Sequence, residues 1–74
     1  MKLSEYLSTQ PRGALISIAR AIGAHPPDVS DWVSNKRPVP LHRAVAIEQE
    51  TGGAVTRRDL RPDDWMLIWP ELAN

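Results

Sequence analysis

Apolar residues recur at helical spacing in two neighbouring stretches in the first half of this sequence. The repeating positions are Leu15, Ile18 and Ile22 in the first stretch and Val29, Trp32 and Val33 in the second. Because a helix brings every third or fourth residue to the same side, each stretch predicts a short amphipathic helix. Gly23 lies between them, where the chain must reverse and a residue without a Cβ can adopt a positive φ angle. The pattern predicts a helix-turn-helix.

The residues around this turn fit the same geometry. Ala19 has a side chain small enough to let two steeply crossing helices approach closely. Pro26 and Pro27 can open the second helix, because the amides they lack would have no partner in a first helical turn. The side chains expected to face inward are Ile18, Ile22, Ala24, Val29 and Trp32. Those expected to face outward are His25, Pro26, Pro27, Ser30, Asp31 and Ser34.

Further helices are predicted on both sides of this motif. Leu3, Tyr6 and Leu7 share one helical face, and this first helix should end within residues 9–11. Residues 34–40 contain turn formers and two prolines, so they predict a loop.

The second half of the chain predicts three more helical segments. One helix of about three turns should lie between Pro40 and Gly52. Residues 56–59 form a near relative of a capping box and predict a short helical turn. Pro62 should then start a last helix, which runs over the large apolar residues 65–69.

Together these elements predict an all-α protein, a compact bundle of five to six short helices that contains a helix-turn-helix. The 74 residues are expected to form one domain, in which residues 62–74 are a Trp-rich C-terminal helix or tail. A C-terminal β-hairpin is the less favoured variant, because five large apolar residues in a row also suit a strand. The capping residues and prolines after Gly52 favour the helical variant, since no alternation brackets a hairpin turn.

The composition narrows the class of protein. An apolar fraction of 42% is enough for a folded globule, and the chain has no cysteine, so disulfides and zinc-thiolate sites are not expected. The N-terminal apolar residues are interrupted before a secretory signal can form, and no apolar run reaches membrane-spanning length. A cytoplasmic location is therefore expected.

No catalytic constellation stands out in the sequence. His25 and His42 are the only histidines, and two such ligands without a paired carboxylate motif make a poor metal site. The spacing of Ser30 and Asp31 matches no nucleophile motif. We expect a protein that is not an enzyme and that needs neither a metal nor a cofactor.

The charge distribution is more informative than the total charge. The formal net charge is zero, which argues mildly against a nucleic-acid binder. Residues 34–47, however, contain Lys36, Arg37 and Arg43 and no acid at all. Positive potential is therefore expected to be local and modest, although a short basic run is also ordinary for solvated surface.

Residues 15–34, with the following loop 35–40, resemble the helix-turn-helix of the lambda Cro and CI repressor superfamily. Residues 39–62 are similar to the Cro-like YdaS family, whose members carry a comparable proline, amphipathic helix, Gly-Gly turn and Thr-Arg-containing end. The second part of this resemblance is the more specific. It implies a lambda repressor-like fold and a phage- or prophage-type transcriptional regulator that binds operator DNA.

The second helix of a helix-turn-helix enters the major groove, where its start and outward face reach base edges. The residues expected to read bases are His25, Pro26, Pro27, Ser30, Asp31 and Ser34. The residues expected to contact the DNA backbone are Arg12, Asn35, Lys36, Arg37 and Arg43. The predicted reading helix has no Arg, Gln or Asn, and Asp28 with Asp31 would repel phosphates. Anchoring should therefore come from the flanking cations.

Repressors of this superfamily bind as twofold dimers, so the resemblance also implies a homodimer on double-stranded DNA. The residues expected at the dimer interface are Trp65, Met66, Leu67, Ile68, Trp69 and Leu72. Trp69 is the strongest interface candidate, while Trp65 and Ile68 can instead close the open side of the bundle. The alternative function is an antitoxin-like or protein-binding helix-turn-helix module, whose Trp-rich tail would hold a toxin or another protein.

Overall fold

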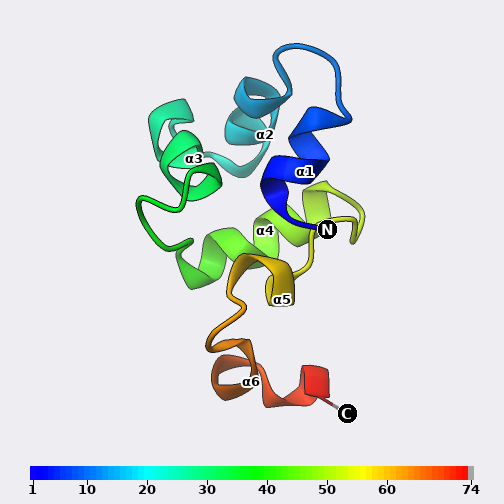
Figure 1. Cartoon of the computed structure of the whole chain (residues 1–74), viewed down its shortest axis with the longest axis vertical. Helices are drawn as coiled ribbons and strands as arrows, with labels where there is room; N and C mark the ends of the chain where they lie inside the picture. The colour runs from blue at the N-terminus through cyan, green and yellow to red at the C-terminus, as the bar shows by residue number, and fades with distance from the viewer. Residues whose placement is uncertain (74) are drawn as a thin grey trace.

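The computed structural model describes residues 1–73, which contain six α-helices, one 3-10 helix and no β-strand (Figure 1). The α-helices are α1 (Leu3–Ser8), α2 (Ala14–Ile22), α3 (Pro26–Val33), α4 (Leu41–Glu50), α5 (Arg57–Leu60) and α6 (Trp65–Ile68). The 3-10 helix η1 spans Pro70–Ala73. The all-α prediction is confirmed, and the C-terminal β-hairpin variant is wrong. None of the helices in the described part of the chain is long and apolar enough to cross a bilayer.

Three helices end with the same hydrogen-bonded turn. After α2, Gly23 has a φ angle of 74°, and the Ala24 amide donates to the Ala19 carbonyl at 2.8 Å. After α4, Gly52 has a φ angle of 62° and the next amide likewise reaches back to the last helical turn. Asn35 takes the equivalent position after α3, with a φ angle of 62°. This turn uses carbonyls that a helix end would otherwise leave without partners.

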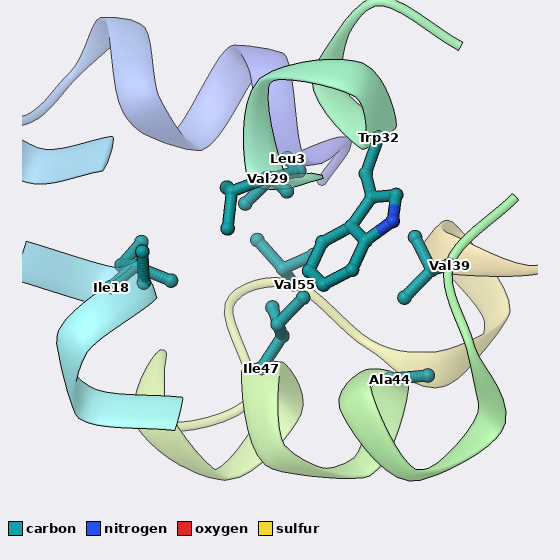
Figure 2. Packing of buried hydrophobic residues seen from close by; sticks show 9 residues of the cluster. Leu3, Ile18, Val29, Trp32, Val39, Ala44, Ile47 and Val55 are labelled. Atoms are coloured by element: carbon teal, nitrogen blue, oxygen red, sulfur yellow. The ribbon is translucent and has the colours of Figure 1, made fainter. Parts of the chain in front are cut away.

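The core lies where α1, α2, α3 and α4 meet. Ala19 is fully buried, as its predicted position at the crossing of α2 with α3 requires. Figure 2 shows the Trp32 indole of α3 lying among Val39, Ile47 and Val55. The nine buried residues are Leu3, Ile18, Ala19, Val29, Trp32, Val39, Ala44, Ile47 and Val55. The core therefore draws on nearly every element before α5, and it fixes how α3 is presented to solvent.

The start of the last helix was predicted wrongly. The sequence indicated a helix from Pro62, but residues 62–64 form a turn and α6 begins only at Trp65. The Arg61 guanidinium explains the difference, because it binds both carboxylate oxygens of Asp64, at 3.0 and 2.6 Å. The same guanidinium donates to the Val39 carbonyl at 2.6 Å. These contacts hold the turn against the loop before α4, so the helix starts after it.

The molecule is elongated, with extents of 36 × 21 × 19 Å. α2 packs on both α3 and α4, whereas α6 packs mainly on η1. Figure 1 shows α6 and η1 at one end of the long axis, with α2 toward the other end. Residues 62–73, which we call the C-terminal segment, thus extend away from the helix-turn-helix.

Candidate nucleic-acid interface

The turn between α2 and α3 is held from a third helix. Arg43, in the first turn of α4, donates one hydrogen bond to the Ile22 carbonyl and a second, of 3.1 Å, to the Gly23 carbonyl. A cation at a helix C-terminus also interacts favourably with the helix dipole. Arg43 therefore fixes the turn that sets the position of α3 relative to α2.

The start of α3 carries the outward face that the sequence predicted. His25 is the N-cap residue, in an extended conformation, and Pro26 and Pro27 occupy the first helical positions. The side chains of His25, Pro27, Ser30 and Ser34 are exposed, while Pro26 and Asp31 are half-buried. The structure thus brings all six predicted base-reading residues onto one short helix and its caps.

The Ser34 hydroxyl on this face already has a hydrogen-bond partner. Ser34 donates to the Ser30 carbonyl at 3.0 Å, which uses its proton within the helix end. Ser34 is exposed, so its oxygen can still accept a hydrogen bond, but it cannot donate one without a rearrangement.

Four of the five predicted backbone-binding residues fall into two groups. Asn35 and Lys36 are exposed directly after α3. Arg37 and Arg43 line one cleft between the beginnings of α3 and α4, together with His42, which is not one of the predicted contacts. Arg12 lies apart from both groups, next to the N-terminus of α2, in a second cleft that Tyr6, Ser17 and Glu50 also line.

The loop cation Arg37 is bound to two carboxylates of α3. Its guanidinium forms one ion pair with Asp28 and a second with Asp31, in which the Nε and Oδ2 atoms are 3.4 Å apart. Lys36 has no ion pair within residues 1–73. The two neighbouring cations therefore differ, since Lys36 is available to an external anion and Arg37 is already occupied.

The C-terminal segment is attached by two arginines of α5. The Arg58 guanidinium lies 4.3 Å from the centre of the Trp65 ring and donates to the Leu72 carbonyl. The Arg57 guanidinium lies 5.3 Å from the centre of the Trp69 ring, which packs against the core cluster. Such stacking of a cation on an indole is favourable at partly exposed sites.

The exposed apolar atoms of this segment belong to other residues. Leu67 is 82% exposed and Met66 is 49% exposed. Trp65, Ile68, Trp69 and Leu72 are half-buried. Of the residues predicted for a dimer interface, Leu67 and Met66 are thus the most accessible, and the two tryptophans are partly covered by their own chain.

Sequence reasoning missed the roles of the α5 arginines and of the residues that anchor them. Arg57 also pairs with Glu48 of α4 at 3.0 Å, and Asp59 closes the capping box with Thr56. Only the capping box was readable in the sequence, because its spacing is local. The Arg57–Glu48 and Arg57–Trp69 pairs join residues 9 and 12 positions apart and have no periodic signal. They depend on how α5 packs on α4 and on the C-terminal segment.

The titration of Asp59 reflects these contacts. Burial raises the pKa of Asp59, but hydrogen bonds from the Thr56 amide, the chain's terminal ammonium and the Thr56 hydroxyl outweigh burial, so the pKa is lowered. Hydrogen bonds from Arg61 likewise lower the pKa of Asp64. Both carboxylates are therefore stabilised in their charged forms.

A protein family and a named bacterial protein are similar to this chain. Residues 8–68 match the model of a family described as bacterial toxin YdaS. The chain belongs to the YdaS family. It is also 43% identical over 57 residues to an Escherichia coli (strain K12) protein named "Putative transcriptional regulator YdaS". The match covers 76% of this chain and 58% of that protein, so the chain spans little more than half of its relative.

The YdaS match confirms and extends the resemblance read from the sequence. It includes the whole of α2 to α6, and therefore both the helix-turn-helix and most of the C-terminal segment. The descriptions of the family and of the relative differ, because one names a toxin and the other a transcriptional regulator. Within the described residues, no group of three or more His, Asp or Glu side chains could hold a metal ion.

Proposed function

We propose that this YdaS-family protein is a sequence-specific DNA-binding transcriptional regulator of the Cro repressor type. The observation that carries this proposal is the exposed N-terminal face of α3, which stands clear of the core and is followed at once by the exposed Lys36. A helix presented in this way can enter the major groove with its first turns against the bases. The name of the Escherichia coli relative supports a role in regulation.

Lys36 and Arg12 are the proposed phosphate contacts. Lys36 lies beyond the C-terminus of α3, and Arg12 lies beside the N-terminus of α2, where Gly13 has no side chain to cap the first amides. Open amides at a helix start and a nearby cation together favour a phosphate oxygen. Arg43 has a supporting role in this proposal, since it holds the α2–α3 turn that positions α3 and the loop with Lys36.

The proposed DNA complex contains two copies of the chain. One α3 helix can contact only a few base pairs, so an operator requires two half-sites about one helical turn apart. The C-terminal segment is the proposed contact between copies, because Met66 and Leu67 expose apolar area there.

Binding of a labelled random duplex, measured by fluorescence anisotropy over a range of salt concentrations, tests the proposal. We expect affinity to fall steeply with salt, and Lys36→Ala to reduce the slope of log K against log salt by about one. Lys2→Ala is the matched control, because it removes the same charge from the start of α1. Wild-type protein that binds no duplex even at low salt would overturn the proposal.

The second candidate function is a protein-binding module. The exposure of Leu67 and Met66 favours it, and so does a net charge of zero. In that case the C-terminal segment would contact a different polypeptide, and the α3 face would be ordinary surface. Substitution of Lys36 would then have no effect on function, whereas Leu67→Asp would abolish it.

A further inference from the structure

The ion pairs of Arg37 join the loop after α3 to the helix itself. Arg37 binds Asp28 in the first turn of α3 and Asp31 in its second turn, and its own backbone amide donates to the Asp31 carbonyl at 3.4 Å. The Arg37 side chain is 53% exposed. The guanidinium can therefore turn to an external ligand without disturbing the core.

These pairs reduce the attraction of the surface for DNA. The Asp28–Arg37–Asp31 cluster carries one positive and two negative charges, and Lys36 beside it brings the local sum to zero. Non-specific affinity for DNA comes from cations that neutralise phosphates. Of the two loop cations, only Lys36 can neutralise a phosphate without competition from a carboxylate.

We propose that the Asp28–Arg37–Asp31 cluster is an intramolecular competitor of the DNA phosphate, and that it couples the phosphate contact of Arg37 to base identity. This inference rests on the proposed function. The carboxylates hold Nε and Nη2 of Arg37, so a phosphate that binds this edge of the guanidinium must displace both of them. On random DNA the released carboxylates then lie unpaired against a negatively charged groove, which opposes the exchange.

A suitable base removes the part of this opposition that comes from Asp31. Asp31 lies on the face of α3 that the sequence assigns to base reading, and a carboxylate oxygen accepts a hydrogen bond from the amino group of cytosine. At a site with cytosine under Asp31, the carboxylate exchanges one donor for another while Arg37 moves to the phosphate. The cluster thus disfavours random sequence and favours a site with cytosine at that position.

A double-mutant cycle tests the competition. Asp28→Asn/Asp31→Asn should bind random duplex about fivefold more tightly than the wild type, with a salt slope steeper by about one, because Arg37 is then free. Asp63→Asn/Glu71→Gln is the matched control, since it removes two exposed charges from the C-terminal segment. In an Arg37→Gln background the two Asn substitutions can still raise affinity by removing negative charge, but they should no longer steepen the salt slope, because the added phosphate contact belongs to Arg37.

The outcomes separate the inference from the proposed function. If the wild type binds duplex but the two Asn substitutions change nothing, or if the steeper salt slope persists without Arg37, the competition is refuted while DNA binding stands. If neither wild type nor variants bind any duplex at low salt, the proposed function fails as well. Circular dichroism of each variant checks that the helices are retained. Asp31→Asn alone is a milder variant for this purpose, because it keeps the charge of Asp28 at the start of α3.

Selection of duplexes from a random pool tests the link to base identity. Wild-type protein should enrich cytosine at one position of each half-site, and Asp31→Asn should lose that preference while keeping the preferences at other positions. Enrichment that is identical for the two proteins would refute the coupling.

Discussion

At the scale of single residues, Asn35 shows how a surface position can be set by backbone geometry. The sequence assigned it to the DNA backbone, and it is exposed after α3 as that role requires. It also has a φ angle of 62°, at the position that Gly23 and Gly52 occupy after α2 and α4. Asn is among the few residues with a Cβ that visit this conformation routinely. The positive φ angle required at the end of α3 is therefore sufficient to explain an Asn at this position, without any contact with DNA.

This gives a prediction that separates the two roles of Asn35. Asn35→Gly should leave the free energy of unfolding unchanged or raise it by a few tenths of a kcal/mol, whereas Asn35→Ala should lower it by about 1 kcal/mol. Urea denaturation followed by circular dichroism measures both. Equal stability of the Gly and Ala variants would mean that the positive φ angle is not what selects Asn here.

Asp59 allows a prediction about pH. Its pKa is lowered in the folded protein, so its carboxylate stabilises the fold above the pKa of about 3.9 that an unfolded Asp has. This stabilisation is lost as the pH falls through the lower, folded-state pKa. Asp59→Asn should therefore be less stable than the wild type at pH 7, by about 1 kcal/mol, and the difference should shrink towards pH 2. Thermal unfolding at several pH values measures it, and a difference that stays constant with pH would contradict the assignment.

At the scale of helices and turns, local signals proved reliable. Gly23, Gly52 and the Thr56–Asp59 capping box each fixed a helix boundary, because each acts within a few residues of the chain. The predicted start of α6 is wrong because the Arg61 side chain reaches back to Val39, a contact across 22 residues that local spacing does not show. The ion pairs of Arg37 were missed for a similar reason, since they depend on how the loop after α3 folds back over the helix.

Arg43 carries a prediction at this scale. The sequence placed it at the DNA backbone, but its guanidinium is bound to the last carbonyls of α2. Arg43→Ala should therefore lower the free energy of unfolding by roughly 1–2 kcal/mol, because it leaves these carbonyls without their donor. Lys36→Ala should change stability by less than about 0.5 kcal/mol. Urea denaturation of both variants decides the matter, and equal effects would remove the supporting role of Arg43.

At the scale of the whole molecule, the elongated shape separates two surfaces with different chemistry. The α3 face is polar and carries the loop cations, while the exposed apolar atoms of Met66 and Leu67 lie in the C-terminal segment. Figure 1 shows this segment at the opposite end of the long axis from α2. A second copy that contacts the segment would therefore leave the α3 face of each chain uncovered. The sequence could indicate that residues 65–69 are apolar enough to form a contact. Only the packing of Trp65 and Trp69 against the α5 arginines shows which side chains of this run remain exposed to solvent.

The last prediction concerns this contact between copies. Leu67→Asp should weaken association of two chains on a duplex about tenfold or more, because it places a charge in a contact that depends on apolar burial. Ile16→Asp is the matched control, since Ile16 is also an exposed apolar residue but lies on α2. Sedimentation of protein with and without a selected duplex measures the stoichiometry, and circular dichroism checks the fold of both variants. Two chains per duplex for wild type and Ile16→Asp, and one for Leu67→Asp, would place the interface in the C-terminal segment. A single chain per duplex for the wild type would remove the dimer from the proposed function, while unchanged pairing of Leu67→Asp would move the interface to another surface.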